Sequence, residues 1–257
     1  MHTQDIYPSS FKDLVVAISG ASSGIGLATG RAFVSKGAKV YNLDLVNSAE
    51  AEEFFFINAD VTKLATVQAA MKQIEDECDR LDILVNNAGI SFVGTVEETK
   101  EEDWLRVFDV NVFGMARLSA AALPLLRKSK CPNIVNLCSV GALNGLPQRV
   151  LYDATKGAIL SMTFSMATDH VREGIRINCV SPGTVHTSFV DRMLQKFPDP
   201  EKERAALNAR QATGRMVTPE EVAGAILYLA DPLSASTTGI TLEVDGGMHN
   251  LRVRPIQ

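Results

Sequence analysis

The sequence predicts a doubly wound α/β domain, in which a parallel sheet carries helices on both faces. Three observations predict it. Short runs of residues alternate with longer helical patterns almost from the start of the 257-residue chain. The short runs are apolar throughout, as are parallel strands buried on both faces. No Pro/Gly/Ser-rich linker and no internal repeat interrupts the alternation. We therefore expect residues 1–257 to form a single domain.

The individual elements follow from this alternation. In chain order, the predicted strands are "LVVAIS", "AKVYNLD", "EFFFINAD", "LDILVNNAG", "NIVNLCS", "IRINCVSPG" and "TLEVDGG". The predicted helices are Gly24–Ser35, Leu64–Glu77, Glu101–Lys128, Leu151–Arg172 and Pro219–Ala230. Residues 185–218 break the rhythm, because they are polar, contain "FPDPEKER" and follow a strand end. We interpret them as a helical substrate lid, with an added surface segment as the alternative.

Composition excludes several classes of function. Hydrophobic residues make up 46 % of the chain and charged residues 21 %, and the net charge of −5 comes without a basic run that would attract nucleic acid. The N-terminal stretch lacks a signal-peptide pattern, and no apolar stretch of about 18 residues predicts a membrane helix. The four cysteines form no Cys-x-x-Cys pair. We therefore expect no metal site, and reduced thiols in a cytoplasmic protein.

The first strand leads into the glycine-rich turn "SGASSGIG". Glycines between a strand and a helix allow a tight turn and let the backbone approach a pyrophosphate at the helix N-terminus. The spacing here is Gly-x-x-x-Gly-x-Gly, and a glycine triplet alone could serve geometry only. In this context we predict a nucleotide cofactor bound by Gly20, Ser23, Gly24, Ile25 and Gly26.

Asp44 ends the second predicted strand, eighteen residues after Gly26. A carboxylate there accepts hydrogen bonds from the adenosine ribose hydroxyls and repels a 2′-phosphate. Ser23 stands in the turn where a basic residue would suit that phosphate, and no Lys or Arg immediately follows Asp44. We therefore predict NAD as the cofactor. The alternative is a polar strand end without this role.

Tyr152 lies four residues before Lys156, so both side chains project from one face of the predicted helix. A neighbouring ammonium group favours the tyrosinate form, which can accept a proton. Ser139, at the end of a strand, could hydrogen-bond the substrate oxygen. A Tyr-x-x-x-Lys pair alone is common on solvated helices. Combined with Ser139 and the glycine turn, the three side chains suit removal of an alcohol proton while hydride leaves the same carbon.

These residues carry a resemblance to a known family. The chain resembles the classical short-chain dehydrogenase/reductase family over essentially its whole length. The matching motifs are "SGASSGIG", "NNAG" at 86–89, Asn111 in "NVFG", Ser139, Tyr152, Lys156 and "PGTVHT" at 182–187. Ser19 stands where the family usually has threonine, and its hydroxyl can make a similar bond. The resemblance implies a Rossmann-type fold with a seven-stranded sheet, and nicotinamide-dependent hydride transfer.

The resemblance also implies a role for each residue. Tyr152 would be the acid/base, Lys156 would bind the cofactor ribose and support the tyrosine, and Ser139 would position the substrate. Asn111 would hold a water in the proton relay, although it could simply cap or kink its helix. "NNAG" could be only a strand-to-loop turn. The further cofactor contacts implied are Asp60, Val61, Asn87, Ala88, Gly89, Tyr152, Lys156, Val185 and Thr187.

Arginines near the predicted catalytic tyrosine bear on the substrate. Arg149 lies three residues before Tyr152, and the lid segment supplies further arginines. Guanidinium groups bind carboxylates in a bidentate way, so these residues suggest an acidic substrate. The alternative is that they pair with lid carboxylates such as Asp191 and Glu203. The predicted substrate-binding residues are Ser139, Arg149, Tyr152, Arg192 and Arg210.

The stretch "ARQATGRMVTPEEVAGAILYLA", with "PGTVHT" and Arg149, resembles one branch of the family. That branch includes dehydrogenases of 2-keto-3-deoxy sugar acids, from fuconate or rhamnonate, and cytosolic 3-hydroxybutyrate dehydrogenases. It implies NAD-dependent oxidation of a hydroxy acid to a keto acid. The polar lid favours a sugar-derived acid, hence a place in sugar acid catabolism, and His186 could contact a sugar hydroxyl.

Several alternatives remain for the activity. They are a 3-hydroxybutyrate-type dehydrogenase, a 3-ketoacyl thioester reductase, a neutral sugar or polyol dehydrogenase, and a non-catalytic protein that senses the cofactor. The expected partner is a small-molecule substrate, with no nucleic acid and no membrane. Helices 101–128 and 151–172 carry apolar and small residues on more than one face, which suggests a subunit interface. The resemblance implies a homotetramer.

Overall fold

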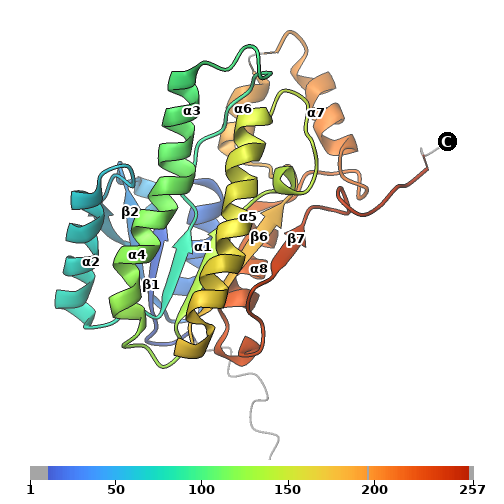
Figure 1. Ribbon diagram of the computed structural model, residues 1–257. Coiled ribbons are helices and arrows are strands. Elements are labelled where there is room, and N and C mark those ends of the chain that lie inside the picture. Colours follow the sequence, from blue (N-terminus) through green and yellow to red (C-terminus); the bar gives the residue numbers. More distant parts are fainter. Residues whose placement is uncertain (1–10, 196, 255–257) are drawn as a thin grey trace, which may run out of the picture.

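Seven parallel strands form one sheet in the part of the chain that the computed structural model describes, residues 11–195 and 197–254 (Figure 1). The strands are β1 Val15–Ser19, β2 Lys39–Asp44, β3 Phe55–Asn58, β4 Ile83–Asn86, β5 Asn133–Leu137, β6 Arg176–Pro182 and β7 Thr241–Val244. Their order is β3-β2-β1-β4-β5-β6-β7, and every neighbouring pair is parallel. The predicted doubly wound fold with seven strands is confirmed.

Eight α-helices connect or follow these strands in the described residues. They are α1 Gly24–Val34, α2 Leu64–Cys78, α3 Glu101–Phe108, α4 Gly114–Leu126, α5 Val150–His170, α6 Ser188–Leu194, α7 Pro200–Ala209 and α8 Pro219–Ala230. None of the described helices is long and apolar enough to cross a membrane. Helix α8 has the bounds that the sequence predicts, because Thr218 and Glu221 form a reciprocal capping box at its start.

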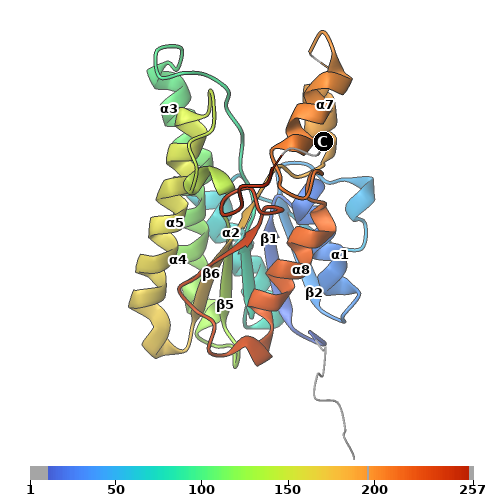
Figure 2. The same cartoon turned by 90° about the vertical axis from the view of Figure 1, so that its right-hand side faces the viewer.

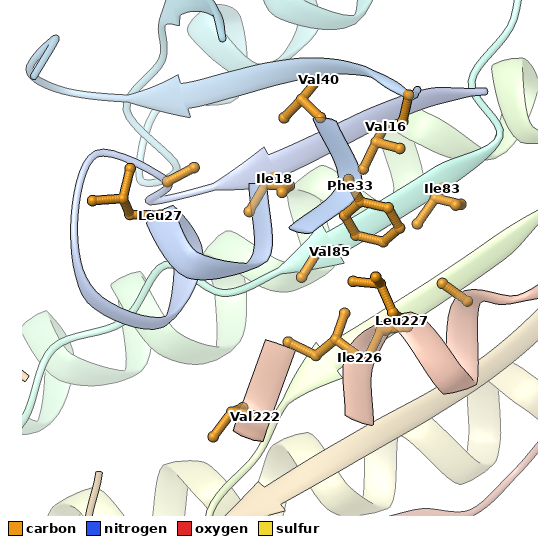
Figure 3. Close-up of a cluster of buried hydrophobic side chains, with 14 of the residues drawn as sticks. Val16, Ile18, Leu27, Phe33, Val40, Ile83, Val85, Val222, Ile226 and Leu227 are labelled. Atoms are coloured by element: carbon orange, nitrogen blue, oxygen red, sulfur yellow. The ribbon is translucent and has the colours of Figure 1, made fainter. Parts of the chain in front are cut away.

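The helices divide into two layers, one on each face of the sheet (Figure 2). Helices α1 and α8 pack on one face, and α2, α4 and α5 pack on the other. Along β1, Val16 and Ile18 face the first layer, whereas Val15 and Ala17 face the second, which is the alternation of a strand buried on both sides. Figure 3 shows the cluster under α1 and α8, where Phe33 lies among strand valines and isoleucines. Burial of each large apolar side chain contributes roughly 1.5–3 kcal/mol.

The segment predicted as one helix over residues 101–128 is interrupted. A π-helical turn, Asp109–Phe113, separates α3 from α4. At its centre the Asn111 side chain reaches the chain after β4, where Oδ1 accepts from Ile90 N at 2.8 Å and Nδ2 donates to Ile90 O at 2.9 Å. The prediction of a regular helix was wrong here, because these two bonds hold the widened turn against its neighbour.

Residues 185–218 form the short helices α6 and α7, which stand beyond the upper end of the sheet in both views (Figures 1 and 2). They share a small apolar cluster of Val190, Leu194, Leu207 and Met216. Gln211, which is only 2 % exposed, fixes the base of the segment, because its side chain accepts from Thr184 N at 3.1 Å and donates to Leu207 O at 2.8 Å. The helical character that the sequence predicts for this segment is present.

Candidate active site

A cavity of about 820 Å³ lies where the carboxyl ends of the strands meet the segment of α6 and α7. In doubly wound sheets, ligands bind at this edge, beside the point where the strand order reverses. Here the reversal falls between β1 and β4. Most of the site residues predicted from the sequence line the cavity: Gly20, Ser23, Gly24, Ile25, Asp44, Asp60, Val61, Asn87, Ala88, Gly89, Ser139, Arg149, Tyr152, Lys156, Val185, Thr187 and Arg210. Gly26, Asn111 and Arg192 are not among the described lining residues.

The turn after β1 requires its glycines. Gly20 has φ +72°, in the left-handed region that favours glycine. A Cβ on Gly26 would lie 2.3 Å from the carbonyl oxygen of Gly20, so a side chain there would push the turn apart. Ser23 precedes α1 without capping it through its side chain, which leaves the first N–H groups of that helix for a ligand. The turn therefore fits a cofactor pyrophosphate.

Two polar side chains of β2 hold the same turn. The Asn42 side chain accepts from Ala21 N at 3.0 Å and donates to Ser22 Oγ at 2.9 Å. The Asp44 carboxylate accepts from Ser22 N at 3.1 Å and from Leu45 N at 2.7 Å. These bonds fix the carboxylate at the cavity wall, with lone pairs left over for the hydroxyls of a ribose. The arrangement fits the predicted adenosine site.

The turn is also joined to the chain after β4. Asn87 Nδ2 donates to the carbonyl oxygens of Ser19 and Gly20, both at 2.9 Å. In return, Ser19 Oγ accepts from Asn87 N and Ala88 N, both at 3.0 Å. The serine hydroxyl thus makes bonds of the kind expected from the usual threonine. These four bonds therefore cross-link the two sides of the cleft.

Two further walls of the cavity come from β3 and β6. After β3, the Asp60 carboxylate accepts from Thr62 N at 2.9 Å and from Thr62 Oγ1 at 2.7 Å, and these bonds hold the pKa of Asp60 below its ordinary value. After β6, Thr187 caps α6 by accepting from Val190 N at 3.4 Å. A Cβ on Gly24 would lie 3.5 Å from the Thr187 methyl group, so the cleft is narrow at this point.

The predicted catalytic side chains come together at the middle of the cavity. Tyr152 and Lys156 lie one turn apart on α5, with Lys156 Nζ 5.6 Å from the centroid of the tyrosine ring. Lys156 is 4 % exposed, and Nζ donates to Leu137 O at 2.8 Å, which leaves N–H groups for a ribose. Ser139 Oγ accepts from Gly141 N at 3.1 Å and donates to no described residue. Its hydroxyl hydrogen is therefore left for a substrate oxygen.

Asn111 is not among the described residues that line the cavity. Besides its bonds to Ile90, Nδ2 donates to Thr155 Oγ1 at 3.1 Å, and Thr155 lies beside Lys156 on α5. Both amide hydrogens are thereby used within the protein. The side chain supports the alternative of a helix-kinking role and joins the chain after β4 to the catalytic helix. Its role in a proton relay stays a prediction.

Arg149 reaches the cavity from the segment before α5. Its Nη1 donates to Ser91 Oγ at 2.7 Å and to Phe92 O at 3.1 Å, and it forms no ion pair with a described residue. Burial holds the pKa of Arg149 below its ordinary value, and the charge of Arg210 acts in the same direction. A partly desolvated guanidinium without a carboxylate partner attracts an anion.

The other predicted arginines separate into two groups. Arg210, after α7, lines the cavity and forms no ion pair with a described residue. Arg192 is exposed and lies outside the lining, so the structure does not bring it to the site. Arg215 forms a bidentate pair with Glu221, at 2.9 and 2.6 Å. His186 contacts Asp191 at 3.0 Å through Nε2, not the cavity.

Three residues in or next to the site were not predicted from the sequence. Asn42 is a fully buried polar residue in the middle of β2, and its polarity between two apolar neighbours was the signal that could have found it. Ser91 carried no motif at all. Asp153 follows Tyr152, and its Oδ2 accepts from Leu146 N at 3.1 Å while its buried Oδ1 has no partner among the described residues. Burial raises the pKa of Asp153 to about 6.

Comparison with known proteins gives consistent matches. A family model described as enoyl-(acyl carrier protein) reductase matches residues 20–249. Dehydrogenase/reductase SDR family member 6 of Rattus norvegicus is 37 % identical over 236 residues, covering 91 % of this chain and 96 % of the relative. The 2-(S)-hydroxypropyl-CoM dehydrogenase 3 of Xanthobacter autotrophicus is 39 % identical over 251 residues, covering 92 % and 97 %.

A solved structure agrees in fold. Ligand-free aldohexose dehydrogenase of Thermoplasma acidophilum superimposes with a TM-score of 0.90 at 34 % identity, covering 96 % of this chain and 98 % of that chain. The matches therefore extend over nearly the whole of this chain.

Proposed function

Because the chain belongs to the classical short-chain dehydrogenase/reductase family, whose relatives here are oxidoreductases of CH–OH groups, we propose that it oxidises the secondary alcohol of a hydroxy acid to a ketone with NAD. The proposal that the substrate is an acid rests on two arginines, Arg149 and Arg210, which line the same cavity as Tyr152. Neither arginine has a carboxylate partner among the described residues.

Different residues of the cavity have different roles in this reaction. The bound nicotinamide supplies the chemistry of accepting or delivering hydride. Ser139 donates its free hydroxyl hydrogen to the substrate oxygen and so places the alcohol beside Tyr152. The Tyr152 oxygen takes the alcohol proton, and the Lys156 charge stabilises the tyrosinate that does so. Lys156 also binds the cofactor ribose through the N–H groups that Leu137 leaves free.

The preference for NAD rests on Asp44. Two backbone N–H groups fix its carboxylate, which supplies negative charge at the adenosine end of the cavity. A 2′-phosphate would lie against that charge and be repelled. Among the described lining residues, the basic ones are Arg149, Lys156 and Arg210, and none of them belongs to the strands that form the adenosine end.

The lining also distinguishes two kinds of acid. The sequence favours a sugar-derived acid because residues 185–218 are polar. In the structure some of these polar groups are engaged by other protein side chains: Arg204 Nη2 donates to Asp191 at 2.9 Å, and Arg215 binds Glu221 in α8. The side chains that this segment and its neighbours turn to the cavity are mainly apolar: Val140, Leu146, Phe189, Val190, Met193 and Leu207. The geometry therefore favours a short hydroxy acid of the 3-hydroxybutyrate type over a 2-keto-3-deoxy sugar acid.

The test is NAD reduction, followed at 340 nm, on 3-hydroxybutyrate, 2-keto-3-deoxy sugar acids, neutral sugars and polyols, with NADP in parallel. We expect turnover of an acid with NAD. The Arg149→Ala variant should raise KM for that acid by at least about tenfold, since a charge-assisted bidentate contact is lost. Turnover of neutral substrates alone, or an unchanged KM in the variant, would contradict the proposal.

A second candidate is oxidation of a neutral sugar. The similarity to an aldohexose dehydrogenase favours it. A neutral sugar would leave Arg149 and Arg210 without a partner, and the apolar lining would leave several sugar hydroxyls without hydrogen bonds. The substrate panel separates the two candidates directly.

We also propose that the protein acts as a homotetramer. Phe113 and Phe164, on the outer side of the layer of α4 and α5, are 50 % and 41 % exposed. Exposed aromatic side chains on sheet-covering helices are typical of a subunit interface. Sedimentation analysis at micromolar concentration should give a tetramer, and a monomer would contradict this.

A further inference from the structure

We propose that Ser91 determines the preference for an anionic substrate, by holding the Arg149 guanidinium in place without neutralising its charge. The inference rests on the proposed function, because it explains how Arg149 recognises an acid. It assigns Ser91 the part of a positioning residue, since it acts through Arg149.

The first step is the geometry of the contact. Arg149 directs a single nitrogen, Nη1, to both Ser91 Oγ and Phe92 O, at 2.7 and 3.1 Å. Its Nη2 and Nε donate to no described residue. The guanidinium is thus held at one corner, and its remaining edge is left for a ligand in the cavity that both Ser91 and Arg149 line. A planar fork held in this way can present two parallel N–H groups to one anion.

The second step is that the contact is braced by the backbone. Gly94 N donates to Gln148 O at 2.9 Å, and Gly94 forms an isolated parallel bridge with Arg149. Gln148 has φ +56°, a conformation that costs a non-glycine residue free energy. The segment after β4 and the segment before α5 are therefore joined by the main chain as well as by the arginine. Ser91, three residues before Gly94, is thereby kept close to Arg149.

The third step concerns charge. Both acceptors of Nη1 are neutral, one a hydroxyl and the other a carbonyl oxygen. Arg215 offers the contrast within the same chain, because its guanidinium faces the Glu221 carboxylate with both terminal nitrogens. That pair places two opposite charges in direct contact, whereas Arg149 is partly desolvated and forms no ion pair with a described residue, the nearby Asp153 acting on it only through its field. A carboxylate at position 91 would give Arg149 a charged partner of the kind that Arg215 has in Glu221.

The experiment compares two ligands that differ in charge. Acetoacetate and its neutral methyl ester are titrated calorimetrically into the NAD-loaded enzyme, and the ratio of their two dissociation constants is recorded. Ser91→Asp supplies a carboxylate, Ser91→Ala removes the hydroxyl, and Ser91→Thr restores it. We expect the wild-type preference for acetoacetate to be lost in Ser91→Asp, reduced about tenfold in Ser91→Ala and retained in Ser91→Thr.

Each outcome distinguishes the two proposals. A purely structural role for Ser91 would weaken acetoacetate and the ester equally, and an unchanged ratio in Ser91→Asp and Ser91→Ala would overturn the inference. Arg149→Ala is the control for the proposed function. If the wild type shows no preference, or if Arg149→Ala retains it, then the proposed acid site itself fails. If Arg149→Ala loses the preference while the Ser91 variants keep it, only the inference on Ser91 fails.

Discussion

The cofactor half and the substrate half of the cavity are built in different ways. In the cofactor half, side chains in or directly after strands bind main-chain groups of neighbouring segments: Asn42 binds Ala21, and Asn87 binds Ser19 and Gly20. In the substrate half, α6 and α7 share a small apolar cluster of their own, and Arg204 of α7 donates to Asp191 of α6. The cofactor half therefore belongs to the sheet, whereas the substrate half is formed by helices outside the sheet.

This difference separates the reaction from the choice of substrate. A substitution in the cofactor half disturbs main-chain geometry that every substrate needs. A substitution in the substrate half changes which molecule is held beside Tyr152. Variants from the two halves should therefore differ in kind, and the following predictions test that separation in order of decreasing effect.

The largest effect should come from Tyr152→Phe. Removal of the hydroxyl takes away the proton acceptor, and turnover should fall by about 10²–10⁴-fold. NAD affinity, measured by fluorescence titration, should remain, because the turn after β1 and Asp44 are untouched. Full activity in this variant would contradict the role assigned to the tyrosine hydroxyl.

Asp44→Asn, a substitution in the cofactor half, should change the preference between NAD and NADP. The amide keeps an acceptor for Ser22 N or Leu45 N but removes the negative charge. We expect kcat/KM with NADP, relative to NAD, to rise by about tenfold, which corresponds to about 1.4 kcal/mol of lost repulsion. The ratio is measured with one fixed alcohol. If it does not move, the carboxylate does not exclude the 2′-phosphate.

Within the substrate half, Arg210→Ala and Arg192→Ala form a matched pair. Arg210 lines the cavity and Arg192 does not. We expect the first variant to raise KM for the acid by about five- to tenfold, as for the loss of one charged hydrogen bond, and the second to leave it unchanged. The reverse result would mean that α6 turns toward the substrate when it binds.

The smallest effect should be the pH dependence of Asp153. Burial raises its pKa from the ordinary 3.8 to about 6, so between these values the folded state binds the proton that the unfolded state has released. The contribution of this group to the free energy of unfolding therefore falls as pH rises from about 4 to 6 and stays low above that.

Asp153→Asn cannot ionise and can still accept from Leu146 N. Thermal melts from pH 4.5 to 7.5 should therefore show the Tm of the variant gaining on that of the wild type as pH rises. A constant difference across the series would show that the carboxyl titrates in its ordinary range.

The sequence was sufficient for the fold and for placing most of the predicted cofactor-binding residues along one cavity. Strands apolar on both faces predict the parallel sheet, and the order of motifs places the glycine turn, Ser139 and Tyr152 at strand or helix ends that meet at one edge. Local signals explain this success. The Thr218–Glu221 capping box marks the start of α8, and glycines mark the turn that cannot bear a side chain at position 26.

The substrate half could not be read in the same way, because its contacts join residues distant in the chain. Ser91 and Arg149 are separated by 58 positions, and Arg204 and Asp191 by 13. Whether an arginine faces a cavity, a carboxylate or solvent depends on how α6 and α7 pack. That packing produces no periodic pattern in the amino-acid sequence. Arg192, in α6, and Arg210, directly after α7, look equivalent in sequence, and only the fold places one outside the cavity and the other in its lining.

The π-helical turn at Asn111 has a consequence for how such a chain can change over time. A π turn is an α-helix with one additional residue, so it is gained or lost by inserting or deleting a codon and not by exchanging one amino acid for another. Deleting one residue from 109–113 would join α3 and α4 into a regular rod with α4 still facing the sheet. The link from Ile90 to Thr155 would vanish with it. Helix α5 is therefore tied to the chain after β4 by a feature that exchange of single amino acids cannot build.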